Sequence, residues 1–169
     1  MTVAAKLPLR LKLGHGLGSI AYGVKDNGFS TFLLIYYNQV LGMDAKLVSF
    51  ALLVALVLDA FVDPVVGHMS DRTYTRWGRR LPWLYLAPIP LGIAWLFLWA
   101  PTDPAHVSFG YLVGVAFVVR ALVSACEVPS VALVPELTRD YDERTGLMRF
   151  RYLFGWAGDL VIEGPAALK

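Results

Sequence analysis

Three carboxylates stand inside stretches of the sequence that are otherwise apolar. Asp59 and Asp63 are four residues apart within residues 45–67, so a helix places them on one face, about 6 Å apart along its axis. Two like charges that close repel unless a cation, a proton or a basic side chain compensates them. Glu127 lies at a similar depth in its own stretch, about 27–30 Å from the same end, one turn after Ser124. This all-oxygen set suits Na⁺ or a proton rather than zinc or copper, and it predicts one cation site.

One arginine could change the chemistry of that site. Arg120 stands alone in an apolar stretch, at about the same depth as Asp59, and this makes the two residues candidate partners. If they pair, Asp59 contributes less to cation binding, and a proton-coupled pair of Asp63 and Glu127 is left. The sequence keeps both interpretations open.

A second group of ionisable residues lies in the first apolar stretch. Asp26, about 12 residues into it, is flanked by Lys25 and can accept hydrogen bonds from solute hydroxyls. The competing interpretation is an ion pair between Asp26 and Lys25 or Arg120. Glycines make this stretch thin, which allows close helix packing or leaves room for a ligand. These glycines are Gly14, Gly16, Gly18, Gly23 and Gly28.

Enzyme chemistry has no support in the sequence. The three histidines, His15, His68 and His106, are far apart, and no nucleophile elbow or P-loop occurs. Cys126 is the only cysteine, which excludes a disulfide scaffold and a cysteine-based metal cluster. A net charge of +2 provides little electrostatic attraction for a nucleic acid. We therefore expect no enzyme, no cofactor, no resident metal and no nucleic-acid partner.

The elements that must hold these residues are membrane-spanning helices. Of the 169 residues, 57% are hydrophobic and only 17% are charged, and the mean hydropathy is +0.56. A helix needs about 20 apolar residues to cross a bilayer. The sequence predicts an all-α integral membrane protein with five spans, the fifth incomplete. The expected spans are residues 14–41, 45–67, 81–100, 107–133 and 147–169.

Basic loops alternate with loops that are poor in Lys and Arg. The segment 1–13 and the loop 70–80 are basic, whereas the connections around residues 42–46 and 101–104 are not. Positive charge marks the cytoplasmic side. We therefore expect a multi-pass protein of the plasma (inner) membrane with a cytoplasmic N-terminus.

Four motifs in this order resemble one known family. Residues 67–83 read GHMSDRTYTRWGRRLPW, residues 59–64 read DAFVDP, Lys25 precedes Asp26, and residues 127–145 begin with EVP and continue into a charged loop. This pattern is similar to the glycoside–pentoside–hexuronide:cation symporters of the major facilitator superfamily, the group of melibiose permease. The resemblance covers about residues 13–158.

The resemblance implies a helical transporter that couples entry of Na⁺, H⁺ or Li⁺ to sugar uptake. Asp59, Asp63 and Glu127 fall on the family's cation carboxylates, and Ser124 falls on a hydroxyl position. Asp26 and Arg151 fall on sugar-contacting positions, and we group Lys25 and Arg120 with them as candidate solute contacts. The loop after the second span implies a latch between helix ends, formed by Gly67, Asp71, Arg72, Arg76, Gly78, Arg79 and Arg80.

The sequence also departs from the family pattern. Glu127 replaces an Asp, Arg120 has no counterpart in melibiose permease, and Val131 stands where that protein has a substrate-stacking Trp. The cation site is therefore better supported than melibiose-like sugar recognition.

Length leaves several functions open. The superfamily has twelve spans in two halves with the solute between them. We expect this chain to be the N-terminal part, helices 1–4 and the start of helix 5, of such a transporter, whose partners are the bilayer, a sugar-like solute and the absent C-terminal half. The alternatives are a stand-alone multi-span protein that self-assembles, a carrier of lysolipids or other solutes, and a non-transporting relative of the same fold.

Overall fold

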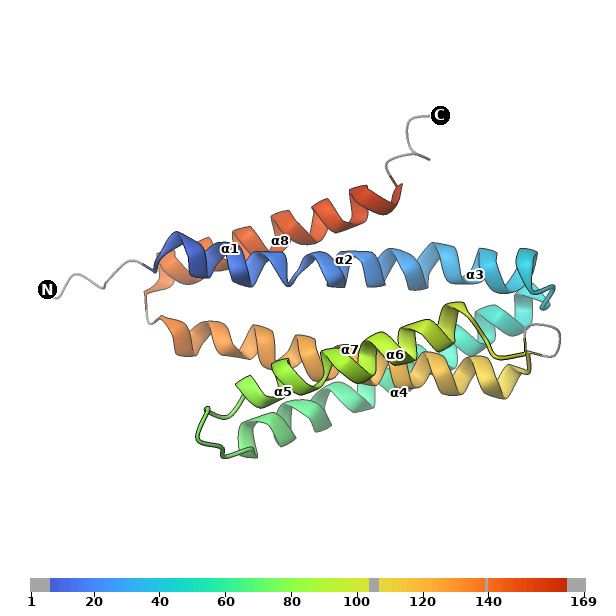
Figure 1. Ribbon diagram of the computed structural model, residues 1–169, viewed down its shortest axis with the longest axis horizontal. Helices are drawn as coiled ribbons and strands as arrows, with labels where there is room; N and C mark the ends of the chain where they lie inside the picture. The colour runs from blue at the N-terminus through green and yellow to red at the C-terminus, as the bar shows by residue number, and fades with distance from the viewer. Residues whose placement is uncertain (1–6, 104–106, 139, 164–169) are drawn as a thin grey trace, which may run out of the picture. The chain divides into compact units, whose positions relative to one another are not determined.

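The computed structural model describes residues 7–103, 107–138 and 140–163, with the side chains of 26, 27, 30 and 161–163 left out. These residues are almost entirely helical, and the single extended pairing described among them is an isolated bridge between Thr75 and Gly78 (Figure 1). The predicted all-helical fold is therefore confirmed. The segments are α1 (Leu9–Leu17), α2 (Ile20–Asn27), the π-helix η1 (Gly28–Phe32), α3 (Leu33–Ile35), the π-helix η2 (Tyr36–Val40), α4 (Ala45–Arg72), α5 (Leu81–Leu86), α6 (Pro88–Trp99), α7 (Phe109–Leu137) and α8 (Tyr141–Glu163).

Three segments are long and apolar enough to cross a membrane among the residues described: Ala45–Arg72, Leu81–Trp99 and Phe109–Leu137. They correspond to the second, third and fourth expected spans. Helix α4 continues to Arg72, past the expected end at residue 67, and α7 continues to Leu137 rather than 133. Helix α8 begins at Tyr141, ahead of the expected start at 147. Whether the first and fifth expected spans cross the bilayer stays a prediction.

The first expected span is divided into short helical segments. Its glycines lower helix propensity, and the helix is interrupted at Gly18, where the Ser19 amide donates to the Gly16 carbonyl at 2.8 Å rather than four residues back. Two π-helical turns follow, η1 and η2. The sequence analysis anticipated a thin segment but not these irregular turns.

The turn between η2 and α4 has clear local causes. Gly42 adopts a positive φ of 71°, a conformation that glycine tolerates best. Asp44 then caps α4, because its carboxylate accepts a hydrogen bond from the Lys46 amide at 2.8 Å. The side chain of Asn38 closes the turn by donating to the Met43 carbonyl at 2.8 Å.

The chain divides into two units, which are described separately. In the first unit, residues 1–32 and 132–169, helices α1 and α2 lie beside α8. A Cβ atom at Gly23 would overlap the Gly155 carbonyl oxygen, and one at Gly158 would lie 2.5 Å from the Ile20 carbonyl oxygen. Backbone therefore approaches backbone, as small residues permit in membrane helix pairs.

In the second unit, residues 33–131, tyrosines from two elements hold the end of α6. The hydroxyl of Tyr37 is buried and donates to the Leu98 carbonyl at 2.8 Å. Tyr36 donates to the Trp99 carbonyl at 2.8 Å, and Tyr111 donates to the Phe97 carbonyl at 2.7 Å. The final carbonyls of a helix have no partner within it, so these phenols satisfy groups that would be costly to leave bare.

Candidate cation and solute site

The central polar contact of the second unit joins Asp59 on α4 to Arg120 and Ser124 on α7. The guanidinium of Arg120 donates twice to Asp59 Oδ2, from Nη2 at 2.6 Å and from Nε at 2.9 Å. Ser124 Oγ donates to the other carboxylate oxygen, Oδ1, at 3.1 Å. Both charged side chains are largely enclosed, with 16% of Asp59 and 18% of Arg120 exposed. Of the interpretations that the sequence left open for Arg120, the structure adopts the pair with Asp59.

This contact is a strong one in chemical terms. Two charge-assisted bonds to one carboxylate oxygen, together with the serine bond to the other oxygen, fix the direction of the Asp59 side chain. Inside an apolar helix pair the alternative for either residue is an uncompensated charge, which is costly. Asp59 therefore carries a counter-charge supplied by the protein itself.

The other two carboxylates of the predicted cation site are placed differently. Asp63 lies one turn further along α4 and is exposed, and Glu127 on α7 is half-buried. The two helices also approach further along, where a Cβ at Gly67 would lie 3.6 Å from Val128 Cγ1. Asp63 and Glu127 thus fall between two points of contact of the same helix pair. Within the described residues, no three acidic, histidine or cysteine side chains gather as a metal-binding cluster.

The predicted solute residues that can be described lie in the first unit. Arg151 on α8 is 7% exposed, and its guanidinium carbon lies 4.8 Å from the centre of the Tyr22 ring on α2. This is cation–π geometry, which holds the arginine in place. Lys25 is half-buried on α2, and the side chain of Asp26 lies outside the described residues.

The sequence analysis did not single out Tyr22. The spacing in the sequence could have identified Tyr22, because it precedes Asp26 by four residues and such residues share a face of a helix. A tyrosine on the face of a candidate sugar-binding carboxylate is a group worth marking, since it offers both an aromatic surface and a hydroxyl.

The predicted latch loop joins the end of α4 to the start of α5. Arg80 pairs with Asp71 at 2.7 Å, which ties the two helix ends together. Gly78 has a positive φ of 102°, so it makes the tight turn that brings them close. Arg76 lies over the Trp77 ring at 5.5 Å, while Arg72 is exposed at the end of α4. The loop is therefore tied to both helix ends within its own unit.

Long apolar helices that enclose a carboxylate–guanidinium pair are typical of multi-span membrane proteins. A family model described as MFS/sugar transport protein matches residues 14–163, and the chain belongs to this family of the major facilitator superfamily. A putative glycoside/cation symporter of Escherichia coli is 33% identical, with 95% of this chain and 35% of the relative covered. The predicted relationship to the glycoside/cation symporters is confirmed, and the family is one of transporters rather than enzymes.

Curated relatives agree with this assignment. An uncharacterized symporter of Synechocystis is 34% identical, with 94% of this chain and 30% of the relative covered. The isoprimeverose transporter of Lactiplantibacillus pentosus is also 34% identical, with 92% and 33% covered. A sodium-dependent lysophosphatidylcholine symporter of Gallus gallus is 27% identical, with 86% and 28% covered. The chain spans about a third of the length of these relatives.

Proposed function

We propose that this chain supplies the N-terminal helices of a cation-coupled symporter for a sugar or glycoside. The observation that carries the proposal is the Asp59–Arg120 pair, with a further carboxylate, Asp63, one turn along the same helix. The isoprimeverose transporter supports a saccharide as the solute. The remaining helices of such a transporter would supply the other wall of the solute cavity.

Coupling in this proposal depends on two carboxylates. Arg120 already neutralises Asp59, so the cation, Na⁺ or H⁺, is taken up by Asp63 and Glu127. An alternative site contains all three carboxylates and Ser124, and it requires Asp59 to leave Arg120. Solute is bound by Asp26, Arg151 and Lys25, and linkage requires that cation and solute strengthen each other's binding reciprocally.

The test is a titration on the transporter that carries this chain, reconstituted in proteoliposomes. Isoprimeverose binding is measured against Na⁺ at fixed pH, and then against pH without Na⁺. A response to pH alone supports a proton-coupled pair of Asp63 and Glu127, and a response to Na⁺ supports a metal-ion site. If neither variable changes the affinity, the symport proposal is wrong.

Two substitutions separate the proposed roles. Asp63→Asn should weaken cation-dependent uptake far more than cation-independent solute exchange. Asp26→Asn should weaken solute binding under every cation condition. Equal effects of both substitutions on both measurements would contradict the division into a cation site and a solute site.

A second candidate solute is a lysophospholipid, because a sodium-dependent lysophosphatidylcholine symporter is among the relatives. The same proteoliposomes can be offered lysophosphatidylcholine in parallel with isoprimeverose. Uptake of lysophosphatidylcholine without uptake of isoprimeverose would indicate that the solute is a lysophospholipid rather than a sugar.

We place the protein in the plasma membrane with its N-terminus and the loop 70–80 in the cytoplasm. The support is the alternation of basic loops. A Thr75→Cys variant should resist an impermeant thiol reagent in intact cells and react after permeabilisation. The native Cys126 adds little background, because it is 6% exposed. Strong labelling from outside would contradict the proposed orientation and place the loop 70–80 on the outer side.

The loop between α4 and α5 is proposed as a latch in one transport state. Its Asp71–Arg80 pair supports this role, while the simpler interpretation is that its arginines only set orientation. Arg79→Gln in the transporter distinguishes them, since a latch predicts altered transport at normal insertion. Unchanged transport would indicate that the arginines of the loop only set the orientation of the protein in the membrane.

A further inference from the structure

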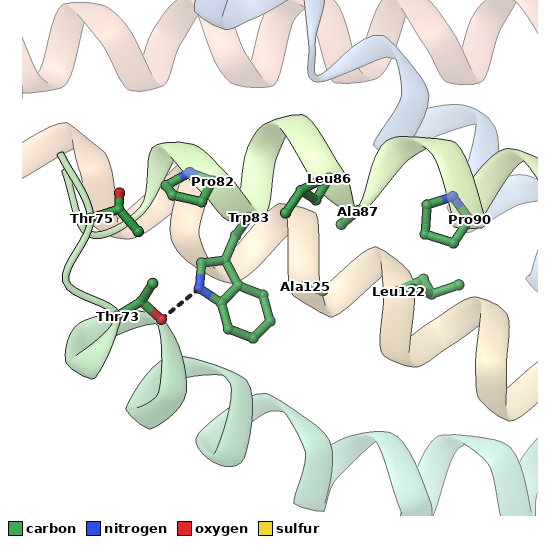
Figure 2. A pocket seen from close by; sticks show the side chains of 9 residues that line it. All are labelled: Thr73, Thr75, Pro82, Trp83, Leu86, Ala87, Pro90, Leu122 and Ala125. Carbon is green, nitrogen blue, oxygen red and sulfur yellow. Dashed lines mark hydrogen bonds between the residues drawn. The ribbon is translucent and has the colours of Figure 1, made fainter. Parts of the chain in front are cut away.

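An apolar pocket of about 470 Å³ lies at the end of the second unit that carries the basic loop. Figure 2 shows Trp83 reaching from α5 toward the end of α4, where its indole nitrogen donates to Thr73 Oγ1 at 3.0 Å. Ala87 and Ala125 form a buried floor, while Leu86 and Pro90 stand exposed at the rim. Its volume falls within the range of about 300–1,000 Å³ that is usual for small-molecule sites.

The pocket is long and has two chemically different ends. Its lining runs along α5 and α6 from Pro82 to Pro90, which is about 12 Å at 1.5 Å per residue. Threonines lie at the loop end, whereas the other end is lined by hydrocarbon, including Leu122 on α7. An occupant must therefore be apolar along most of its length and polar at one end.

Positive charge flanks the polar end. Arg72 directly precedes the lining residue Thr73, and Arg76 directly follows Thr75, and both arginines are exposed. Tyr74 between them is 82% exposed, and Trp77 is 59% exposed. Exposed tyrosine and tryptophan beside a spanning helix are typical of the level of the lipid headgroups.

We infer that this pocket binds an anionic phospholipid, with one acyl chain along α5, α6 and α7 and the phosphate beside Arg72 and Arg76. Clustered arginines next to a spanning helix attract anionic headgroups, which are concentrated in the cytoplasmic leaflet. A second protein helix would fill the apolar part of the groove but would not use the cationic end. The site is separate from the residues proposed for cation and solute, and it does not depend on their assignment.

Trp83 provides a direct probe of the site. The chain is placed in nanodiscs of phosphatidylcholine that contain increasing mole fractions of dibrominated phosphatidylglycerol, whose acyl bromines quench nearby indoles. Dibrominated phosphatidylcholine is the comparison lipid. The contribution of Trp83 is obtained by subtracting the signal of Trp83→Phe, because the chain has four further tryptophans. We expect phosphatidylglycerol to quench Trp83 at a mole fraction at least about five-fold lower, which corresponds to one arginine at an anionic surface.

Matched variants distinguish a built site from general charge attraction. R72Q/R76Q should bring the two lipids close to equal quenching, whereas R10Q/R149Q removes the same charge from the first unit and should leave the preference in place. Ala87→Leu fills the floor and should lower quenching by both lipids. Retention of phosphatidylglycerol in native mass spectrometry, reduced in R72Q/R76Q, gives the same test if Trp83→Phe does not fold.

Three results would overturn the inference. Equal quenching by both lipids in the unaltered chain would remove the headgroup preference. A preference that survives R72Q/R76Q would show that these arginines do not hold the phosphate. Absence of quenching by either lipid would mean that protein, a second copy included, closes the pocket, and this also rejects a lipid site.

Discussion

Helices α2 and α8 meet through glycine, whereas α4 and α7 meet through an ion pair. At Gly23 and Gly158 no side chain separates the two backbones. At Asp59 and Arg120 two charged side chains bridge the helices and meet at 2.6 Å. Both pairs come from the same sequence and are expected to work in the same apolar solvent.

The difference arises because a bilayer provides little hydrophobic driving force for helix association. Lipid tails are as apolar as leucine, so burial of apolar surface does little to bring membrane helices together. Close packing of small residues and polar contacts are the remaining means, and each of the two pairs relies mainly on a different one. The glycine contact holds α2 and α8 mainly by shape, and the cation–π contact between Arg151 and Tyr22 adds to it. The α4–α7 contact holds by charge, and charge is what a coupling cation can alter.

The largest effect is expected from Arg120→Gln, which leaves the charge of Asp59 without its partner. Breaking an enclosed pair in this way costs about 3 kcal/mol. Cys126, buried on α7, reports on the change through its rate of maleimide labelling in detergent, which should rise about tenfold or more. D59N/R120Q removes both charges and should restore most of the protection. Equal labelling of the single and double variants would show that the pair does not hold α7.

The next largest effect is expected from Gly23→Ala, because the added methyl group overlaps the backbone of α8. Overpacking of this kind costs about 1–3 kcal/mol. A Ser19→Cys reporter in a Cys126→Ser background is buried beside α8, and its labelling should accelerate. Gly14→Ala is the control, since a Cβ there meets nothing within 4 Å. The comparison of the two helix pairs fails if Gly23→Ala and Gly14→Ala behave alike.

A smaller effect is expected from Tyr37→Phe. It removes one buried hydrogen bond to the Leu98 carbonyl, which contributes about 1 kcal/mol. Tyr111→Phe removes an equivalent bond at an exposed position and should cost less, because water can replace the phenol. Thermal unfolding midpoints in detergent measure both variants. A larger shift for Tyr111→Phe would contradict the role of burial.

The smallest effect concerns a salt bridge at the start of α8. Lys12 pairs with Glu143 at 2.7 Å, and the Leu7 amide donates to the same oxygen at 3.2 Å. The hydrogen bond from Lys12 holds the pKa of the Glu143 carboxyl below its ordinary value. A lowered folded pKa means that this contact stabilises the protein above the unfolded pKa and is lost as pH falls through the folded pKa.

The check is the thermal midpoint between pH 7 and pH 3. Glu143→Gln should remove part of its decline in acid, and the exposed neighbour substitution Asp142→Asn should remove less. An identical pH dependence in both variants would exclude a contribution from Glu143. Because this contact joins α1 to α8, it tests whether charge adds anything to a unit held mainly by glycine.

Hydropathy and charge predicted the helical architecture, because spanning helices require about 20 apolar residues each. The family was predicted separately, from the resemblance of four motifs in order. Counting residues from the membrane surface also brought Asp59 and Arg120 to the same depth, and the structure pairs them. Depth is a property of one helix, however, and it does not fix rotation about the axis. The gathering of Asp63 and Glu127 into one site therefore stays a prediction, as do the solute contacts of Asp26 and Arg151.

Other features depend on contacts that no local pattern specifies. The glycines predicted a thin helix, but their partner, α8, lies more than a hundred residues away in the sequence. The bonds from Tyr36 and Tyr37 to α6 join elements about sixty residues apart, and tyrosine is also enriched at membrane interfaces, so its presence alone does not predict such a bond. Both kinds of contact depend on how distant helices pack in the folded chain, so local sequence patterns do not predict them.

The last four carbonyls of α6 are all occupied, by the Ala100 amide and by the hydroxyls of Tyr111, Tyr37 and Tyr36. The C-terminal end of a helix ordinarily carries about half a negative charge on such carbonyls. Here the hydrogen-bond donors place positive partial charges directly on them and weaken the field that leaves the helix end. In the proposed orientation this end faces the outside. In the proposed symporter, a cation that arrives there is attracted only weakly by the helix end, so the proposed site at Asp63 and Glu127 competes for it with little interference.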